Sequence, residues 1–180
     1  MVVLQALYFM LPAYFANMAP VFAAKLFGNR WSAPVDGGAR WRGKPILGSH
    51  KTWRGLIAGI AVAIAAVALQ NEAYGASWGK ALSVIPYDSY NLFALGLLFG
   101  VGALGGDMAK SFVKRRVGVA PGRPWAPWDQ LDFVIGALAM VSIVFTPPFI
   151  IVALAIIFSP ALHIAVNQIG YALGLKATRW

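Results

Sequence analysis

A stripe of acidic and basic residues closes one of the long apolar stretches of this sequence, in the run GGDMAKSFVKRR at 105–116. Side chains three, four and seven residues apart share one face of a helix, and four polar residues keep that spacing: Asp107, Lys110, Ser111 and Lys114. The later run WDQLDF places Asp129 and Asp132 three residues apart, where the next apolar stretch begins. Three of the six acidic residues therefore gather at one level of the protein.

Carboxylates that lie side by side repel one another, so a site that keeps three of them needs cations or a metal to offset the charge. Neither run contains histidine or cysteine, and oxygen ligands alone suit a hard cation such as Mg²⁺. Phosphate commonly completes such a site, and nearby cations can bind its remaining oxygens: Lys110, Lys114, Arg115 and Arg116. We therefore expect a site for Mg²⁺ and a nucleoside triphosphate, with Asp107, Asp129 and Asp132 as metal ligands and Lys110 and Lys114 as catalytic cations.

Simpler interpretations of these residues stay open. A lysine near an aspartate at a helix end can extend its ammonium toward the membrane surface and neutralise the acid. A carboxylate in the first turn of a helix, as at Asp129, also caps that helix and suits its dipole. These interpretations account for one acid at a time, and they do not explain why three occur together.

A second candidate for phosphate binding is the loop RWRGKPILGSHKTWRG at 40–55. It is close to a P-loop, but a P-loop follows a strand in an α/β domain, whereas this loop leads into an apolar stretch. Near the N-terminus of the helix expected there, Lys51 and Thr52 can still bind phosphate, and Lys44 and Gly48 are further candidates for phosphate or ribose. The alternative is a basic loop that contacts anionic lipid headgroups.

The elements that must position these side chains are apolar helices. Of the 180 residues, 59% are hydrophobic and 12% are charged, which is typical of a membrane protein. The absence of cysteine excludes disulfides, zinc–thiolate sites and thiol nucleophiles. The Pro147-Pro148 pair indicates a reversal between the last two stretches. We predict an all-α, polytopic integral membrane protein with one catalytic domain over 1–180 and spans at about 2–24, 53–71, 90–112, 130–146 and 149–175.

The distribution of Lys and Arg sets the expected orientation. Seven lie within 25–54, five within 110–123 and two, Lys176 and Arg179, in the C-terminal tail, so fourteen of the fifteen share one side and only Lys80 falls on the other. Such an excess is typical of the cytoplasm, which places the loops 25–52 and 113–129 and the C-terminus inside and the N-terminus outside. We expect a multi-pass protein of the cell membrane with its active site at the cytoplasmic face. The net charge of +9 then faces membrane lipids rather than nucleic acid.

Polar residues within the apolar stretches are few and are expected to turn inward. Asn17 is a candidate substrate contact, and His163 is interpreted as structural. Pairs of glycines four residues apart, such as Gly96 with Gly100 and Gly102 with Gly106, allow helices to approach closely. Packing within one chain and formation of a homodimer explain these spacings equally well.

The quoted runs resemble a known family. GDMAKSFVKRR followed by PWDQLDF, with GKPILGSHKTWRG upstream, is similar to the archaeal CDP-archaeol synthases, distant relatives of the bacterial CDP-diacylglycerol synthases. Lys114-Arg115 matches the KR element of the bacterial signature, but no arginine follows the later acids, which favours the archaeal branch. The resemblance covers nearly the whole chain. It implies CTP and 2,3-bis-O-geranylgeranylglycerol 1-phosphate as substrates, and CDP-archaeol and pyrophosphate as products.

Two other functions are compatible with acids and cations at a membrane surface. CDP-alcohol phosphotransferases also place acids and Mg²⁺ there, but their D-G-x-x-A-R run is missing. A carrier of nucleotides or small anions needs polar residues along a path through the bilayer, whereas the charges here crowd one interface. The sequence therefore favours nucleotidyl transfer over both alternatives.

Overall fold

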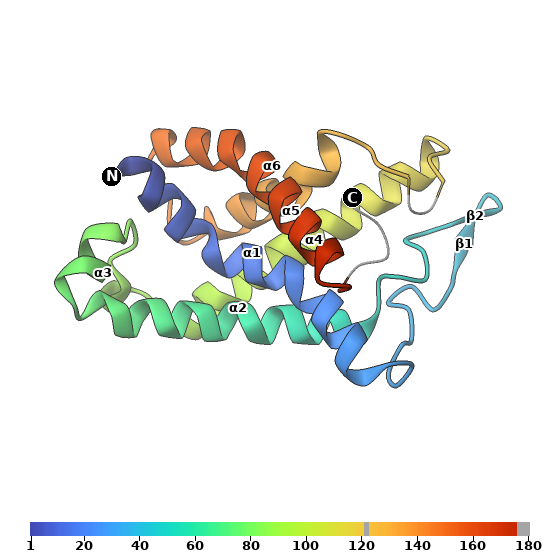
Figure 1. Cartoon of the computed structure of the whole chain (residues 1–180), viewed down its shortest axis with the longest axis horizontal. Coiled ribbons are helices and arrows are strands. Elements are labelled where there is room, and N and C mark those ends of the chain that lie inside the picture. Colours follow the sequence, from blue (N-terminus) through green and yellow to red (C-terminus); the bar gives the residue numbers. More distant parts are fainter. Residues whose placement is uncertain (121–122, 176–180) are drawn as a thin grey trace.

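The chain forms an elongated bundle of helices with a short β-hairpin at one end (Figure 1). This computed structural model describes residues 1–120 and 123–175, so Lys176 and Arg179 of the tail lie outside the described residues. The elements, in chain order, are α1 (Val2–Phe27), β1 (Arg40–Trp41), β2 (Lys44–Pro45), α2 (Trp53–Tyr74), α3 (Ser77–Leu82), a 3-10 turn (Tyr87–Ser89), α4 (Leu92–Arg116), α5 (Trp128–Val141) and α6 (Phe149–Ala172). The hairpin and α3 lie at opposite ends of the bundle (Figure 1).

Four helices of the described chain are long and apolar enough to cross a membrane, namely α1, α2, α4 and α6. α5 has 14 residues. At 1.5 Å per residue it is about 21 Å long, which is shorter than a hydrocarbon layer of about 30 Å. The span expected at 130–146 thus corresponds to a helix that begins at Trp128 and ends at Val141, followed by a turn. The count of five spans stays a prediction.

α4 and α5 pack with their backbones in contact. A Cβ atom added to Gly136 would lie 2.1 Å from the carbonyl oxygen of Gly102, and one added to Gly106 would lie 2.2 Å from that of Asp132. Only glycine permits such an approach, because any side chain would collide with the facing main chain. This contact places Asp132 beside the residue that precedes Asp107.

The other glycine pairs also serve contacts within the chain. Gly96 and Gly100 of α4 face Ile64 and Ile60 of α2, where an added Cβ would lie within 3.0 Å of a Cα atom. Gly59 of α2 faces the carbonyl of Ala16 in α1 at 2.8 Å from the position of an added Cβ. These glycine spacings are thus used by the fold of one chain.

α1 contains two prolines, and α2 compensates for the first of them. Pro12 has no N–H, so the carbonyl of Tyr8 four residues earlier lacks its helical donor. The side-chain amide of Gln70 donates to that carbonyl at 2.6 Å, and the Tyr87 hydroxyl donates to the amide oxygen of Gln70 at 2.9 Å. This chain of hydrogen bonds ties α1, α2 and the 3-10 turn together at the end away from the hairpin.

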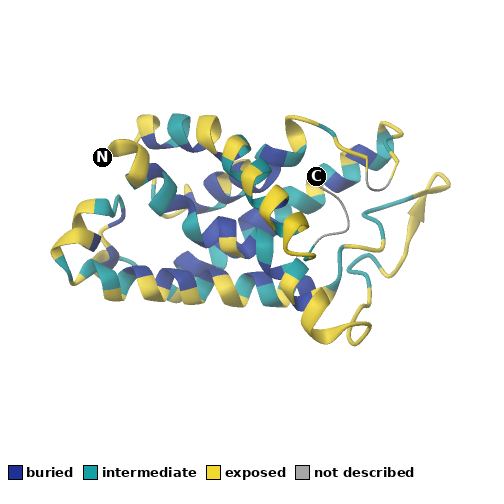
Figure 2. Cartoon of the chain, viewed as in Figure 1, coloured by how far each residue is buried: buried dark blue, intermediate teal, exposed yellow. Residues whose placement is uncertain are grey.

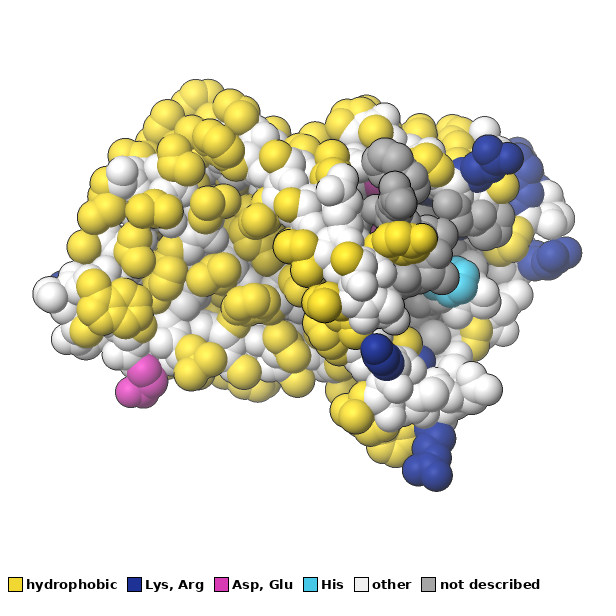
Figure 3. Space-filling view, viewed as in Figure 1, with side chains coloured by type: hydrophobic (Ala, Val, Ile, Leu, Met, Phe, Trp, Pro, Cys, Tyr) yellow, Lys and Arg dark blue, Asp and Glu magenta, His cyan; other side chains and the backbone are white. Residues whose placement is uncertain are grey.

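Buried residues line the inner faces of the helices, and exposed residues lie on their outer faces and along the hairpin (Figure 2). The core includes Phe9, Phe99 and Phe133, each at most 2% exposed. Apolar side chains also cover much of the outer surface of the bundle, while Lys and Arg side chains gather toward the hairpin end of the visible face (Figure 3). An apolar surface with a cationic end is expected of helices that face lipid and end at a headgroup layer.

Candidate active site

Three carboxylates from two helices converge on one lysine at the hairpin end of the bundle. The ammonium nitrogen of Lys110 lies 3.3 Å from Oδ1 of Asp107, 2.9 Å from Oδ1 of Asp129 and 2.8 Å from Oδ2 of Asp132. The side chain of Lys110 is 15% exposed and that of Asp132 is 4% exposed, so these charges interact in partly water-free surroundings. The structure therefore brings together the three acids that the sequence singles out.

Two further lysines flank this centre. Lys51 forms an ion pair with Oδ2 of Asp107. Lys114 donates to both oxygens of Asp129, at 2.9 Å and 2.8 Å. Three carboxylates and three ammonium groups thus form one network, which is electrically balanced when all six groups are charged. We call these six residues the ionic cluster.

The helices set the geometry of the ionic cluster. Asp107 and Lys110 are three residues apart on α4, and the close backbone contact at Gly106 brings Asp132 of α5 next to them. Asp129 lies in the first turn of α5, and its Oδ2 also accepts from the backbone N–H of Trp125 at 2.6 Å. Asp129 therefore binds two lysines and the segment before α5, and it suits the helix dipole from the first turn, but it does not cap α5 with a hydrogen bond.

Lys51 reaches the ionic cluster from the loop between α1 and α2, which is closed at its base. The backbone N–H of Val35 donates to the carbonyl of Lys51 at 2.8 Å, and that of Trp53 donates to Ala33 at 3.1 Å. Thr52 is the N-cap of α2 and accepts from the N–H of Gly55 at 3.2 Å. These bonds fix the backbone on both sides of Lys51.

Asp36 holds the interior of the same loop, a role that the sequence does not reveal. Its carboxylate accepts from the backbone N–H groups of Leu47 at 2.8 Å, Gly38 at 3.0 Å and Gly48 at 3.4 Å. These donors, above all that of Leu47, hold the pKa of Asp36 below its ordinary value. Asp36 is thus a structural residue of the loop that carries Lys51.

The hairpin of this loop is fastened to the end of α4 by Arg116. Its guanidinium donates to the carbonyls of Trp41 at 2.8 Å, Lys44 at 3.3 Å and Pro45. It also lies 5.3 Å from the ring centre of Trp41 and 5.1 Å from that of Phe112, and these two rings are stacked at 5.8 Å. In return, the ammonium of Lys44 donates to the carbonyl of Arg116 at 3.2 Å. We call this set of contacts the hairpin clasp.

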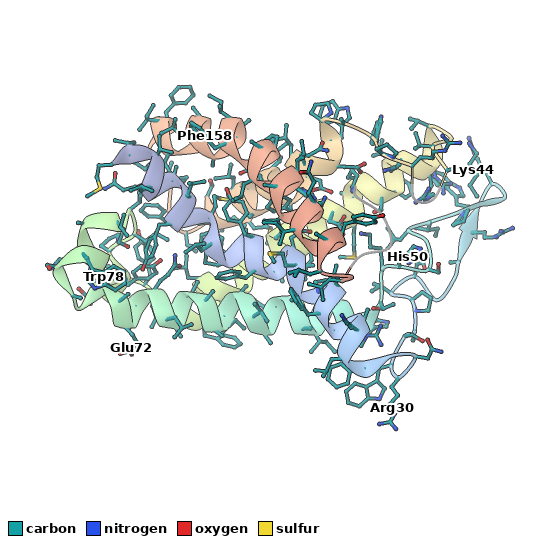
Figure 4. All side chains as sticks on the ribbon, viewed as in Figure 1. Arg30, Lys44, His50, Glu72, Trp78 and Phe158 are labelled. Atoms are coloured by element: carbon teal, nitrogen blue, oxygen red, sulfur yellow. The ribbon has the colours of Figure 1, made fainter. Side chains whose placement is uncertain are left out.

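The hairpin itself is a tight two-residue turn. β1 and β2 are antiparallel, with Arg40 opposite Pro45 and Trp41 opposite Lys44. Arg42 and Gly43 between them have φ angles of 51° and 76°, as expected of a turn that matches the twist of its strands. The labelled side chains of Figure 4 show Lys44 on the hairpin and His50 between the hairpin and the helices.

A cavity of about 640 Å³ opens beside the ionic cluster. Its polar lining includes all six members of the cluster and several other residues, namely Asn17, Lys25, His50, Thr52, Arg123, Gln130, His163 and Asn167. Asn17 therefore lines the same cavity as the carboxylates. Lys25, Arg123 and Gln130 were not singled out in the sequence, because neither their type nor their spacing distinguishes them there.

Some candidate residues do not line this cavity. The Lys44 and Arg116 side chains belong to the hairpin clasp, and the guanidinium of Arg115 donates to the carbonyl of Val119 at 2.7 Å. Gly48 has a φ of 102° and donates its N–H to Asp36, and Ser111 is 5% exposed on α4. In this structure these five residues support the elements around the cavity.

A second, largely apolar cavity of about 250 Å³ adjoins the first between α1 and α6. Its apolar lining includes Met18, Phe22, Phe133, Leu162 and Val166. The two cavities share Asn17, Val21, His163, Asn167 and Leu175. A polar chamber thus continues into an apolar groove that the membrane-facing helices enclose.

The carboxylate oxygens of the ionic cluster are suitable ligands for a hard divalent cation. All its acceptor atoms are carboxylate oxygens, and Oδ2 of the nearly buried Asp132 makes no hydrogen bond. Among the described residues, no three His, Cys, Asp or Glu side chains are drawn together as a ready metal site. Each of the three acids instead contacts the ammonium of Lys110.

Long apolar helices with a partly buried ionic cluster at one end define an integral membrane protein with an enzyme-like site. A family model described as "CarS-like: CDP-archaeol synthase" matches residues 1–180. The CDP-archaeol synthase of Thermococcus onnurineus (strain NA1) is 40% identical over 182 residues, covering 98% of this chain and 96% of the relative. That of Methanosphaerula palustris is 41% identical over 180 residues, covering 95% of this chain and 100% of the relative.

A solved structure, described as that of an intramembrane enzyme for archaeal membrane lipids biosynthesis, is also similar. It has 39% sequence identity and a TM-score of 0.74, and the match covers 92% of this chain and 94% of that chain. The chain therefore belongs to the CarS-like CDP-archaeol synthase family. The expected resemblance and the all-α, polytopic membrane fold are confirmed, and the chain is a CTP-dependent nucleotidyltransferase rather than a carrier.

Proposed function

We propose that this enzyme transfers CMP from CTP to an unsaturated isoprenoid ether-lipid phosphate, 2,3-bis-O-geranylgeranylglycerol 1-phosphate. The products are CDP-archaeol and pyrophosphate, and Mg²⁺ is the required cation. The observation that carries this proposal is that the cavity beside the ionic cluster adjoins an apolar groove, because the reaction joins a polyanion to a lipid. The named relatives, which are CDP-archaeol synthases, support the same choice of substrates.

The polar cavity is large enough for a triphosphate and carries the cations that such a ligand needs. Lys51, Lys110 and Lys114 bind phosphate oxygens, and Lys25 and Arg123 on the lining supply further positive charge. The isoprenoid chains enter the groove between α1 and α6, which leaves the lipid phosphate at the junction of the two cavities. There, Asn17 lies on both linings and can donate its amide to a phosphate oxygen.

The chemical step is a displacement at the α-phosphorus of CTP. An oxygen of the lipid phosphate forms the new P–O bond, and the bond between the α-phosphorus and the bridging oxygen of pyrophosphate breaks. The nucleophile is already an anion, so the enzyme needs no general base. Its residues instead bring two anions together, orient them and neutralise their charge. Mg²⁺ held by Asp107, Asp129 and Asp132 would supply neutralising charge at the reacting phosphates.

The cytoplasmic face is the proposed location of this site. The hairpin end carries the loops rich in Lys and Arg, whereas Glu72 and α3, the helix that contains Lys80, lie toward the other end of the bundle (Figures 1 and 4). Positively charged loops are retained in the cytoplasm, where CTP is made. The orientation therefore agrees with the supply of the nucleotide.

The proposal is tested by assaying the purified enzyme for pyrophosphate release with CTP, Mg²⁺ and the ether-lipid phosphate. Asp132→Asn should reduce the rate by at least about a thousandfold, because it removes one of the charges that hold the cation. Glu72→Gln is the matched control, since it removes an exposed acid at the opposite end of the bundle. A panel of CTP, UTP, ATP and GTP, each with an ether-linked and an ester-linked lipid phosphate, defines the substrates. Undiminished release in EDTA, or a fully active Asp132→Asn enzyme, would refute the metal role.

A further inference from the structure

Lys110 occupies the centre of the carboxylate group. Its ammonium nitrogen lies 2.8 to 3.3 Å from one oxygen of each of Asp107, Asp129 and Asp132. The other two lysines contact one acid each, Lys51 with Asp107 and Lys114 with Asp129. Lys110 is therefore the one member of the ionic cluster that neutralises all three acids at once.

The lining of the polar cavity also holds a buried acceptor without a hydrogen bond. Oε1 of Gln130, a residue 7% exposed on that lining, makes no hydrogen bond within the described part of the chain. Oδ2 of Asp132, by contrast, is ion-paired with the ammonium of Lys110 at 2.8 Å. A buried acceptor without a partner is costly, so Oε1 of Gln130 indicates that a ligand completes the site.

We propose that Lys110 is an intramolecular counter-ion. Its ammonium neutralises the three carboxylates in place of the divalent cation until the nucleotide binds. This inference rests on the proposed function, in which the same three acids bind the metal. When metal and nucleotide enter together, the ammonium leaves the acids and binds a phosphate oxygen of the nucleotide. Lys110 therefore neutralises the acids in the free enzyme and the triphosphate in the complex.

The physical reason is the balance of charge in a partly buried site. A divalent ion that enters alone meets an ammonium at close range, and Lys110 can leave only by becoming an unpaired charge near the membrane. The triphosphate removes this obstacle, because it offers Lys110 a new anionic partner within the same cavity. The flexible four-carbon stem of lysine allows this exchange without movement of α4. Metal and nucleotide are therefore expected to bind cooperatively. Lys110 is a positioning residue, because its ammonium leaves the acids for the metal only when the triphosphate is bound.

The test measures Mn²⁺ binding to the detergent-solubilised enzyme by electron paramagnetic resonance, with and without an α,β-methylene analogue of CTP. The wild-type enzyme should bind Mn²⁺ weakly alone and at least about tenfold more tightly with the analogue. Lys110→Gln should bind Mn²⁺ alone at least about tenfold more tightly than the wild type, and the analogue should add little. Lys80→Gln is the matched control, because it removes the same charge from α3 at the opposite end of the bundle; we expect a change below about threefold.

The outcomes separate this inference from the proposed function. If wild type and Lys110→Gln bind Mn²⁺ alone with equal affinity, and Asp132→Asn abolishes that binding, the counter-ion role is refuted while the metal site stands. If neither protein binds Mn²⁺ even with the analogue, the metal role and this inference both fail. Should Lys110→Gln not fold, Asp107→Asn is compared with the charge-balanced double variant Asp107→Asn/Lys110→Gln. Tighter Mn²⁺ binding by the double variant is then the expected result.

Discussion

Arg116→Gln tests whether the hairpin clasp positions the loop that carries Lys51. The substitution removes the guanidinium that donates to the carbonyls of Trp41, Lys44 and Pro45 and lies over two aromatic rings. Because Arg116 is partly exposed, each hydrogen bond contributes about 0.5 kcal/mol, and each ring contact about the same, which is the low end for such interactions. Together these contacts contribute roughly 2.5 kcal/mol to docking of the hairpin, or about sixtyfold in its docking equilibrium.

The expected consequence is a defect in nucleotide binding rather than in chemistry. Asp36 and the base of the loop still hold it near the helices, so only part of the docked population is lost. We expect the KM for CTP to rise about three- to tenfold, with kcat within about twofold of the wild-type value. Steady-state pyrophosphate release measures both constants, and hydrogen–deuterium exchange of residues 36–48 reports docking directly.

A control and a second variant make this prediction specific. Arg42→Gln removes an arginine that also lies over the Trp41 ring, at 5.6 Å, but belongs to the hairpin itself, and it should leave KM unchanged. Trp41→Ala removes the ring that stacks on Phe112 and should act through the same contacts, so its effect should not add to that of Arg116→Gln. A raised KM with unchanged exchange in the hairpin would refute the clasp and indicate that Arg116 binds the nucleotide itself.

Two further predictions follow from the packing of α4 and from Asp36. Gly106→Ala places a Cβ 2.2 Å from a carbonyl of α5, so it should separate the two helices, lower the Tm in detergent and nearly abolish activity. The neighbouring Gly105→Ala, whose Cβ meets no atom within 4 Å, should be close to wild type, and equal losses in both variants would contradict this explanation. For Asp36, the folded-state pKa lies below the unfolded value, so its contribution to loop stability is complete above about pH 4 and disappears as the pH falls through the folded pKa. Asp36→Asn should therefore increase exchange of residues 36–48 at pH 7, whereas the wild-type loop should loosen only in acid; a wild-type loop that loosens between pH 7 and 5 would be inconsistent with this role.

The sequence predicts five members of the ionic cluster well, because they follow simple helical spacings, whereas Lys51 comes from a loop. Asp107 and Lys110 on one helix, and Asp129 and Asp132 on the next, need only the two helices to be neighbours. The glycines that permit this close approach are visible in the sequence, but the sequence does not show which residues face them. A spacing of four residues does not say whether the facing surface belongs to the same chain or to another.

The hairpin clasp could not be predicted in the same way. Arg116 binds backbone carbonyls more than 70 residues away in the chain, and a carbonyl carries no signal in the sequence. Its cationic side chain therefore suggested a phosphate contact. The end of α5 at Val141 also carries no signal in the hydropathy pattern, since Ile143 and Val144 continue the apolar run while their backbone already forms a turn. Hydropathy reports where a residue can lie in the membrane, and not whether its backbone is helical.

The bond between Gln70 and the carbonyl of Tyr8 has a consequence for the biogenesis of the protein. α1 leaves the ribosome before α2, and with Pro12 in its middle it enters the bilayer with the carbonyl of Tyr8 lacking its donor. The missing donor is synthesised 62 residues later, near the end of α2. Until then, α1 needs water, lipid headgroups or the translocation machinery near that carbonyl, so the first two helices should leave the translocon as a pair.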